Sequence, residues 1–521
     1  MNTTDFLTIA SAIVPDRPAI IFEGKKFTFG QLNERSNRLA HVLTELGIKK
    51  GDIVSILQVN CNQYLEAYFA VVKLGAIFAP LNFRAKAEEL AYMLNNCEAK
   101  ILFVGERYLE MVGTMRLNLP KVQHYISIDN KVDGMLYYED LLAKASAEDV
   151  FTEIDDNDVA MLMYTAGTTG RPKGVPLTHN SFATYMLSNV SPVDPEIEET
   201  NLLTVPLYHV AGAQAVLAAT YGGRTLAMMR QFEVKEWMKT VERTKANRAM
   251  LVPTMLKRVI DDPEFSKHDL SSLKVITYGA ASMPFEVIKK AIEVFPKVMF
   301  INAFGQTETA STITTLGPED HVITGTEEQK QKKLKRLQSS IGRPMDDVQI
   351  KIVDESGKEL PLGEVGEIVA KGSRVMSGYW KDPEKTAKAI RDGWLHTGDK
   401  GYLDDEGYIY LAGRGDDMII RGGENISPEE VENVLYAHPK VEEAAVIAVT
   451  SLEWGQEPKA VVVLKKGEKA TVEELIEFCR QKLSSFKRPR YVVFINELPR
   501  TSTGKILKRV LRDQHGKADN K

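Results

Sequence analysis

Cysteine is scarce in this sequence, and the few cysteines do not form a recognisable set. Only three of the 521 residues are cysteine, namely Cys61, Cys97 and Cys479, and no paired spacing connects them. The odd count and wide spacing argue against a disulfide framework and against a zinc site. Both features fit a reducing compartment, so we expect a cytoplasmic protein.

A long uninterrupted hydrophobic run is also missing. The most apolar region, residues 64–81, contains Glu66, Lys73 and Gly75, which predicts a core helix and strand and not a membrane span. The apolar patch at residues 6–14 lacks a basic start, so we do not interpret it as a signal peptide.

Neither sign of charge dominates, and no internal repeat is visible. The formal net charge is −5, from 66 Lys and Arg against 71 Asp and Glu. This balance lacks the basic footprint of a nucleic-acid-binding protein, so we expect no nucleic-acid partner. The absence of a period of about 20 to 50 residues excludes a repeat protein. With 44% hydrophobic residues the chain is typical of globular proteins, and its length predicts two or three domains.

Predicted strands and helices alternate through the first part of the chain. Two short strands surround Glu23-Gly24, and Thr28 then caps a helix with Gln31 closing a capping box. Further strands are predicted at residues 54–57, 76–79, 99–104, 159–163, 201–205, 249–253, 275–277 and 298–302. The alternation predicts an α/β fold with mostly parallel sheets flanked by helices.

The pattern changes toward the C-terminus. Short strands between turns predict a small β-rich subdomain at about residues 345–413, within an N-terminal domain of residues 1–413. The charged stretch 327–337 is interpreted as a solvated helix or mobile loop in preference to a basic docking surface. Residues 414–521 predict a separate α+β domain. Its two expected capping boxes pair Ser427 with Glu430 and Thr471 with Glu474.

Threonine, glycine and one lysine concentrate at residues 164–175, directly after an apolar run that predicts a buried strand. Glycine lets backbone N–H groups turn toward a ligand, while threonine and lysine add donors and positive charge, which suits the phosphates of a nucleotide. The common P-loop ends differently, in Gly-Lys-Ser/Thr. A solvated surface turn is the alternative for the Gly-Thr-Thr-Gly stretch alone. The residues assigned to the phosphate site are Thr165, Ala166, Gly167, Thr168, Thr169, Gly170 and Lys173.

Other predicted strands end in small or polar residues. These ends are the segments 206–212, 279–281 and 304–308. Because ligands of open α/β sheets bind outside the carboxyl ends of strands, we expect these segments to line one crevice.

The segment 164–175 resembles the signature loop of the adenylate-forming superfamily, which includes acyl-CoA synthetases, adenylation domains of peptide synthetases and firefly-type luciferases. Four more segments resemble this family in the same order along the chain: residues 279–281, 302–309, 395–399 and 499–506. Five matches in register over nearly the whole chain make a chance resemblance negligible.

The resemblance implies a site for ATP and Mg²⁺. In it Thr307 contacts the α-phosphate, and Glu308 together with Thr165 holds the metal. A carboxylate beside a phosphate is repelled unless a cation lies between them, which supports the metal role over a surface acid. Phe304 keeps the ring of a position where many members have Tyr. The other implied contacts are Gly279, Ala280 and Ala281 at the adenine, Asn302 and Gly305 beside the adenylate, and Asp399 and Arg414 at the ribose, whereas His396 is interpreted as structural.

The resemblance also places His209 beside the carboxylate of an acid substrate, although a lone histidine is more often a core residue. Residues 207–213 contain no carboxylate to hold an amino group, which disfavours an amino acid. The small residues near the site favour an acid larger than acetate, and the segment 206–212 resembles family members that act on aromatic, alicyclic or medium-chain fatty acids. The implied pocket consists of His209, Val210, Gly212, Ala280, Gly305 and Ala310.

A second strong match surrounds Lys505. The resemblance implies that this lysine bridges the substrate carboxylate and the α-phosphate, and that the C-terminal domain later rotates about a hinge at Asp416. Gly422 and Gly423 would then line a channel for coenzyme A, where side chains would block the thiol arm. The basic residues that follow, Lys508, Arg509 and Arg512, are interpreted as a solvated face.

These residues predict an acyl-CoA synthetase that uses ATP, Mg²⁺ and coenzyme A on a small-molecule carboxylic acid. A stand-alone adenylation enzyme that loads a carrier protein is the alternative, weakened because no carrier domain follows residue 521 in this sequence. Luciferase-like oxygenation or a catalytically inactive binding protein comes third, and the presence of Lys173, Glu308, Asp399 and Lys505 argues against inactivity. A monomer or a homodimer is expected.

Overall fold

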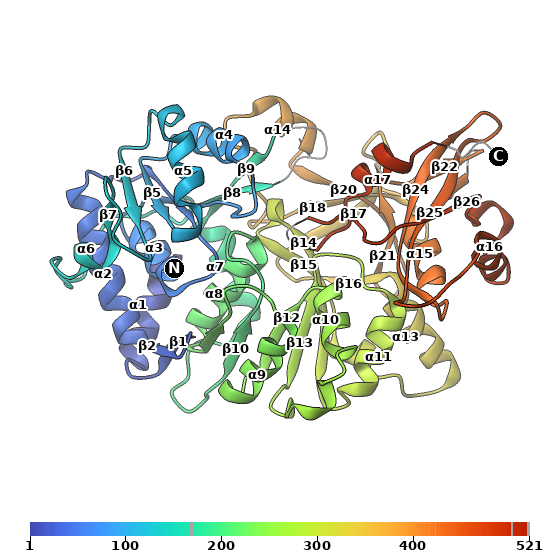
Figure 1. Cartoon of the computed structure of the whole chain (residues 1–521), viewed down its shortest axis with the longest axis horizontal. Coiled ribbons are helices and arrows are strands. Elements are labelled where there is room, and N and C mark those ends of the chain that lie inside the picture. The colour runs from blue at the N-terminus through green and yellow to red at the C-terminus, as the bar shows by residue number, and fades with distance from the viewer. Residues whose placement is uncertain (166–170, 416, 423, 502–503, 518–521) are drawn as a thin grey trace.

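Three β-sheets organise the computed structural model, which describes residues 1–165, 171–415, 417–422, 424–501 and 504–517 (Figure 1). In Figure 1 the third sheet belongs to the orange and red C-terminal part of the chain. No helix in the described ranges is long and apolar enough to cross a membrane. The mixed α/β class predicted from the sequence is confirmed.

The first sheet has seven strands in the order β7-β6-β5-β3-β4-β8-β9. All neighbouring strands pair in parallel except β8 and β9, which are antiparallel. Because β8 runs parallel to β4, its carboxyl end lies at the edge where ligands of such sheets bind. The bounds are β3 (Ile53–Leu57), β4 (Ile77–Pro80), β5 (Ile101–Val104), β6 (His124–Ser127), β7 (Leu136–Tyr137), β8 (Val159–Thr165) and β9 (Lys173–Thr178).

The second sheet has a parallel part formed by β14-β13-β12-β10-β11-β1, with β2 antiparallel at one edge. At the other edge β15 and β16 turn antiparallel and continue the sheet into the β-rich part. The bounds are β1 (Pro18–Phe22), β2 (Lys25–Thr28), β10 (Thr200–Leu203), β11 (Thr225–Met228), β12 (Arg248–Leu251), β13 (Val275–Gly279), β14 (Met299–Gln306), β15 (Ser311–Leu316) and β16 (Ser340–Pro344).

The β-rich part is antiparallel throughout its pairings and is joined to the second sheet where β16 meets β21. Its strands are β17 (Gln349–Val353), β18 (Gly366–Lys371), β19 (Ile390–Arg391), β20 (Trp394–Leu403) and β21 (Ile409–Arg414), and it also carries α14 (Pro383–Ala389). The short strands between turns predicted from residue 349 onward are therefore present. The exact subdomain boundaries stay a prediction.

The helices cover both faces of the first two sheets. One core lies between the sheets, where α1, α2, α3, α7 and α8 pack. On β3, Val54 and Ile56 face this core while Ile53 and Leu57 face α4 and α5 on the other side, as expected of a sheet buried on both faces. The helices of the first layers are α1 (Thr3–Ile13), α2 (Phe29–Glu45), α3 (Asn62–Lys73), α4 (Ala87–Cys97), α5 (Leu109–Met115), α6 (Tyr138–Leu142), α7 (His179–Asn189) and α8 (Val210–Tyr221).

The outer face of the second sheet is covered by α9 (Val234–Thr244), α10 (Pro253–Ile260) and α11 (Phe285–Val294). Trp237, Leu256 and Ile288 are the fully buried contacts of these three helices. The hydrophobic core beneath these helices does not extend over the carboxyl ends of β12, β13 and β14. The residues that follow these strands can therefore form a site.

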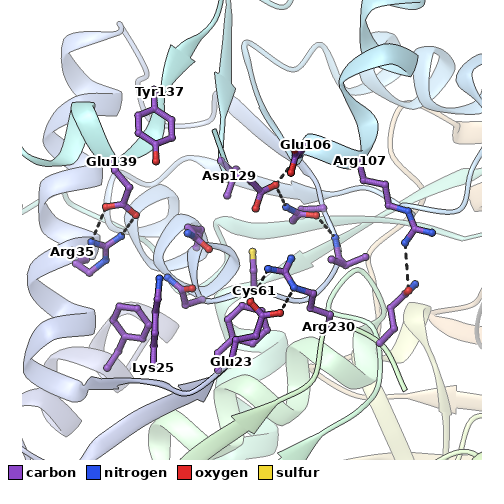
Figure 2. A pocket seen from close by; sticks show the side chains of 18 residues that line it. Glu23, Lys25, Arg35, Cys61, Glu106, Arg107, Asp129, Tyr137, Glu139 and Arg230 are labelled. Carbon is purple, nitrogen blue, oxygen red and sulfur yellow. Dashed lines mark hydrogen bonds and ion pairs between the residues drawn. The ribbon is translucent and has the colours of Figure 1, made fainter. Parts of the chain in front are cut away.

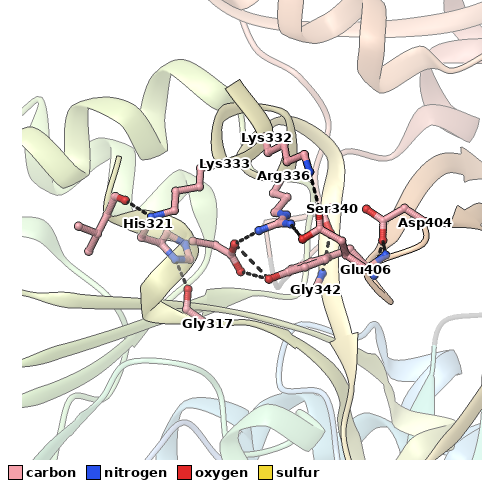
Figure 3. A network of polar contacts seen from close by, with 12 residues as sticks. Gly317, His321, Lys332, Lys333, Arg336, Ser340, Gly342, Asp404 and Glu406 are labelled. Atoms are coloured by element: carbon pink, nitrogen blue, oxygen red, sulfur yellow. Dashed lines mark hydrogen bonds and ion pairs between the residues drawn. The ribbon is translucent and has the colours of Figure 1, made fainter. Parts of the chain in front are cut away.

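The charged stretch at residues 327–337 belongs to α13 (Glu327–Ser339), which follows α12 (Pro318–His321). Arg336 of this helix pairs with Asp320 and Glu406, at 2.8 and 2.7 Å, and Figure 3 shows it directed toward Glu406. Its guanidinium carbon also lies 3.7 Å from the ring centroid of Tyr408, whose hydroxyl donates to Asp320. The helix is therefore tied to the β-rich part through a buried arginine.

The C-terminal part forms a five-stranded sheet with three helices in the described ranges. Its elements are β22 (Ile419–Arg421), β23 (Glu424–Ile426), α15 (Pro428–Tyr436), β24 (Val441–Ser451), β25 (Gly455–Leu464), α16 (Val472–Arg480), β26 (Tyr491–Phe494) and α17 (Lys508–His515). It contacts the rest of the chain at α11, where the backbone N–H of Phe285 donates to Asn433, and through an ion pair of Lys257 with Glu442.

The predicted helix caps differ in outcome. Thr28 and Gln31 form the expected reciprocal capping box. Thr471 accepts from the backbone of Glu474, but the side chain of Glu474 pairs with Lys440 instead of closing the box. At α15 the prediction is wrong, because the Ser427 hydroxyl donates to the neighbouring Glu429 carboxylate and makes no cap hydrogen bond.

Candidate active site

Glu308 lies at a sharp turn after β14. The strand is longer than its sequence predicts and runs through Phe304 and Gly305 to Gln306 before a short 3₁₀ turn, Thr307–Thr309. Ala310 and Ser311 leave this turn with φ of 50° and 91°, backbone conformations that are uncommon for residues with a side chain and that cluster at functional sites. Glu308 is only 7% exposed, so its carboxylate is not a surface acid.

Thr165 ends β8 and pairs directly with Lys173, the first residue of β9. The hydroxyl of Thr165 is buried and has no hydrogen-bond partner among the described residues. An unpaired buried donor and acceptor is costly unless a ligand satisfies it. The residues between these two strands that were predicted to bind phosphate, Ala166, Gly167, Thr168, Thr169 and Gly170, lie outside the described residues.

Lys173 is brought together with Glu308 through a residue that the sequence did not single out. The Lys173 ammonium donates to the hydroxyl of Tyr379 at 2.9 Å, and this hydroxyl donates to Glu308 Oε1 at 2.9 Å. Burial lowers the pKa of Lys173, and the Glu308 carboxylate acts in the opposite direction. No periodicity or charge pattern marks Tyr379 in the sequence.

A metal ion would fit between these groups. Glu308 offers a buried carboxylate and Thr165 an unsatisfied hydroxyl, which are oxygen ligands of the kind that Mg²⁺ prefers. Within the described ranges no group of three or more His, Cys, Asp or Glu side chains is placed to hold a metal alone. Such a sparse ligand set is typical of Mg²⁺ that is shared with substrate phosphates.

Asp399 and Arg414 face each other across neighbouring strands, β20 and β21. Their side chains form an ion pair with Arg414 Nε 2.9 Å from Asp399 Oδ1. The Asp399 carboxylate, more than any other group, raises the pKa of Arg414. His396, on the same strand as Asp399, instead contacts Glu367 at 2.8 Å, in agreement with its interpretation as a structural imidazole.

Lys505 of the C-terminal part is directed toward these residues. Burial and the Arg414 cation lower the pKa of Lys505, and Asp399 and Glu308 act in the opposite direction, so the lysine lies within electrostatic reach of all three side chains. Its loop is a closed hairpin: the backbone N–H of Thr501 donates to the carbonyl of Lys505 at 2.7 Å. The C-terminal part is thus oriented with Lys505 at the crevice.

Of the basic residues after Lys505 that were interpreted as a solvated face, Arg509 is exposed as expected, but for Lys508 and Arg512 the interpretation is wrong. Lys508 is largely buried and its ammonium lies 2.7 Å from Glu432 Oε1 on α15. Arg512 pairs with Asp417 next to the predicted hinge. These two ion pairs fix the helix that follows the Lys505 loop.

His209 stands directly before α8 as its N-terminal flanking residue and is half-buried. Burial, followed by the nearby Lys505 cation, lowers the pKa of His209 to about 4. The imidazole is therefore neutral at pH 7. Val210 and Gly212, predicted to line the crevice after a strand end, belong to the first turns of α8.

Close packing of the backbone requires glycine at three positions of the predicted site. A side chain at Gly305 would collide with the carbonyl oxygen of Ser311, and one at Gly279 with that of Ala303. Gly212 is confined in the same way by the carbonyl of Pro206. Their size therefore does not by itself measure the space that a substrate acid has. Ala280, which follows Gly279, has a φ of 66°.

The remaining predicted nucleotide contacts lie on the same two strand ends. Asn302 pairs with Tyr278 of β13, which leads into Gly279, Ala280 and Ala281. Phe304 is half-buried and packs against the aliphatic cluster of the β-rich part. Thr307 is 9% exposed in the turn beside Glu308.

Of the two glycines predicted for the coenzyme A channel, the structure describes only Gly422. Gly422 has a φ of 58°, and a side chain there would lie 2.8 Å from the ring of Trp454. Gly423 and the predicted hinge residue Asp416 are outside the described residues. The channel and the hinge stay predictions.

A separate polar cavity of about 730 Å³ lies where β3, β5 and β6 end (Figure 2). The side chain of Gln58 and the backbone N–H of Glu106 both donate to Asp129, at 2.9 and 2.7 Å. The predicted site residues are not among the residues that line it, so this cavity is distinct from the cluster around Glu308.

Together the fold and the cluster define a class: a two-part α/β protein in which a lysine of the C-terminal part lies near strand ends that carry a carboxylate suited to a metal and donors suited to phosphates. Comparisons with known proteins specify it. Residues 9–380 match the family of AMP-binding enzymes, and residues 430–505 match the AMP-binding enzyme C-terminal domain. The chain belongs to this family, the adenylate-forming superfamily.

Three relatives illustrate the similarity. The chain is 34% identical to a feruloyl-CoA synthase of an Amycolatopsis species, covering 96% of both chains. It is 32% identical to the fatty acid–acyl-carrier-protein ligase ScoC of Streptomyces coeruleorubidus, covering 96% of this chain and 94% of that one. Among solved structures, the anthranilate CoA ligase AuaEII in complex with anthranoyl-AMP is 28% identical with a TM-score of 0.90, covering 99% and 97% of the two chains.

Proposed function

We propose that the protein converts an aromatic, alicyclic or medium-chain fatty carboxylic acid into its coenzyme A thioester through an acyl-adenylate. The observation that carries this proposal is the position of Lys505, which lies within electrostatic reach of Glu308, Asp399 and Arg414, and also of His209. A cation at the meeting point of a nucleotide site and a carboxylate site suits a reaction that joins two anions.

In the first half-reaction a carboxylate oxygen of the acid attacks the α-phosphorus of ATP, and the bond to pyrophosphate breaks. Lys505 neutralises the two anions as they approach, and Lys173 holds the phosphates that leave. Asp399 and Arg414 orient the ribose, and the neutral imidazole of His209 donates to or accepts from the substrate carboxylate without adding charge. The barrier is lowered mostly by positioning and charge neutralisation.

Glu308 and Thr165 are the residues that would hold Mg²⁺. When bound, the ion supplies positive charge beside the phosphates, where the carboxylate of Glu308 would otherwise repel them. The buried, unpaired hydroxyl of Thr165 supports this assignment. Phe304, Gly279 and Ala280 form the strand ends against which the adenine would lie.

In the second half-reaction the thiol sulfur of coenzyme A attacks the acyl carbon, the thiol proton is released, and the bond to AMP breaks. Lys505 occupies the crevice in the present orientation, so the C-terminal part has to rotate before a thiol can enter. We assign the hinge to Asp416 and the channel to Gly422 and Gly423, where a side chain would obstruct the thiol arm.

The proposed class of substrate acid is supported by the names of relatives, which include ligases for ferulate, fatty acids and anthranilate. An aromatic or medium-chain acid agrees with these and with the lack of a carboxylate in residues 207–213. The alternative is a stand-alone enzyme that loads a carrier protein, and the name of the relative ScoC favours keeping it.

The test is pyrophosphate release from ATP and Mg²⁺ with a panel of carboxylic acids, each with and without coenzyme A. Turnover that requires coenzyme A, with the acyl-CoA detected by mass spectrometry, is the expected result. Slow release that ignores coenzyme A but accelerates with a phosphopantetheinylated carrier protein would establish the alternative. No release with any acid would contradict both.

A further inference from the structure

We propose that Tyr379 is a positioning residue that presents Glu308 to Mg²⁺ and Lys173 to the phosphates of ATP through one phenol. The inference rests on the proposed function, because the metal and the phosphates are those of its first half-reaction. Tyr379 lies between β18 and α14, in a segment that contains no residue predicted from the sequence to belong to the site.

The phenol oxygen has two partners of opposite charge. It accepts a hydrogen bond from Lys173 Nζ at 2.9 Å and donates one to Glu308 Oε1 at 2.9 Å. The ammonium also lies 4.3 Å from the centroid of the tyrosine ring. One side chain therefore separates the cation and the carboxylate, which would otherwise pair directly and neutralise each other before a ligand arrives.

The backbone around Tyr379 is anchored to both partners. The backbone N–H of Met376 donates to the carbonyl of Glu308, and that of Trp380 donates to the carbonyl of Gly174, each at 2.8 Å. The N–H of Tyr379 itself donates to the hydroxyl of Thr386 at 2.9 Å. The ring is thus fixed relative to the turn that carries Glu308 and to the strand that carries Lys173.

The direction of the hydrogen bonds sets the role of the phenol. An ordinary phenol carries its proton at neutral pH, so Tyr379 donates to Glu308. With Oε1 held, Oε2 of Glu308 has no hydrogen-bond partner among the described residues and is the oxygen left for a metal. Groups that orient a metal ligand in this way typically change metal affinity about 10- to 100-fold when they are removed.

The chain offers a matched control. Tyr138 is fully buried between α2 and α3, and its hydroxyl donates to Glu66 Oε2 at 2.7 Å. Arg35 contacts the same carboxylate directly at 3.0 Å, so Tyr138, unlike Tyr379, does not lie between the cation and the carboxylate. Tyr379→Phe and Tyr138→Phe remove the same kind of hydrogen bond.

The experiment measures ATP binding by isothermal titration calorimetry without any acid, so that no reaction occurs, in the absence of Mg²⁺ and at increasing Mg²⁺. Pyrophosphate release is then measured against Mg²⁺ concentration with the best acid. For Tyr379→Phe we expect the Mg²⁺ concentration for half-maximal effect to rise about 10- to 100-fold in both assays. Thioester formation from supplied acyl-adenylate should stay unchanged. Tyr138→Phe should leave the Mg²⁺ dependence as it is.

Several outcomes would overturn the proposal. An unchanged Mg²⁺ dependence in Tyr379→Phe would do so, as would an equal shift in Tyr138→Phe or an equal loss in both half-reactions. The double variant Tyr379→Phe/Glu308→Gln gives a second test, because it should bind Mg²⁺-ATP no more weakly than Glu308→Gln alone. If the wild-type protein releases no pyrophosphate with any acid, the proposed function fails, while the calorimetric comparison still decides the role of Tyr379.

Discussion

Arg414 and Asp399 form an ion pair with Nε and Oδ1 2.9 Å apart across β20 and β21. Both were predicted from the sequence to contact the ribose, and the structure joins them in one ion pair. Arg414 is also the last residue of β21, directly before the segment that leads into the C-terminal part. The pair therefore fixes the carboxylate at the junction of the two parts of the chain.

We expect Asp399→Asn to raise the KM for ATP by about tenfold or more, because a charged hydrogen-bond acceptor for the ribose is lost and Arg414 loses its partner. Glu359→Gln is the control, since Glu359 forms an exposed ion pair with Lys351 in the same β-rich part and such pairs contribute little. Steady-state kinetics of pyrophosphate release give the KM for ATP of both variants. An equal change in both variants would contradict a ribose contact.

Lys505→Ala should abolish most of the adenylate-forming half-reaction and leave thioester formation from supplied acyl-adenylate nearly intact. The reason is that Lys505 lies at the crevice with Asp399, Glu308 and Arg414, where its charge is needed only while two anions approach. Rapid-quench assays of each half-reaction measure the two rates separately. Lys466→Ala, an exposed lysine in the same part of the chain, should change neither rate, and an equal loss of both rates in Lys505→Ala would exclude the assignment.

Local signals predicted much of the fold. The capping box of Thr28 and Gln31 formed as expected because both residues act within one helical turn. At Ser427 the same reasoning failed, since the hydroxyl found the neighbouring Glu429 carboxylate. Lys508 was wrongly predicted to be solvated because its partner, Glu432, lies on a different helix, and no local pattern reports such a contact.

The site residues also divide into those that the local sequence indicates and those that only the fold brings together. Glu308, Asp399 and Lys173 stand in short segments whose composition suits phosphates and metals, so the sequence indicates them without the fold. Tyr379 joins Lys173, which is 206 residues away in the sequence, to Glu308, which is 71 residues away. No sequence pattern near Tyr379 predicts these contacts. The orientation of Lys505 toward the crevice is also a property of packing between the two parts of the chain.

The imidazole of His209 should titrate far below the ordinary range. Its pKa is lowered to about 4 from a reference of 6.5, first by burial and then by the Lys505 cation. Between these two values the unfolded chain binds a proton that the folded chain does not, so the free energy of unfolding should fall as the pH falls from about 6.5 to about 4. His209→Asn should show a smaller fall over this window.

NMR titration of the histidine signals, assigned by comparison with His209→Asn, measures this pKa directly. Lys505→Ala should raise it, because a neighbouring cation is removed. A value near 6.5 in the wild-type protein would mean that His209 is solvated and charged at mildly acidic pH, and would contradict its placement beside the crevice.

Gly305→Ala separates two explanations for a small residue at the site. If the glycine leaves room for the acid, a methyl group should impair only bulky acids. In the structure the methyl group would collide with the carbonyl oxygen of Ser311 on β15, so we expect a loss of stability of about 1 to 3 kcal/mol and the same relative loss of turnover for small and bulky acids. Gly113→Ala is the control, because nothing lies within 4 Å of that position and alanine favours its helix. Denaturant unfolding and an acid panel measure both effects. An unchanged stability combined with a selective loss of bulky acids would show that Gly305 faces the substrate and that the strand pair of β14 and β15 can yield.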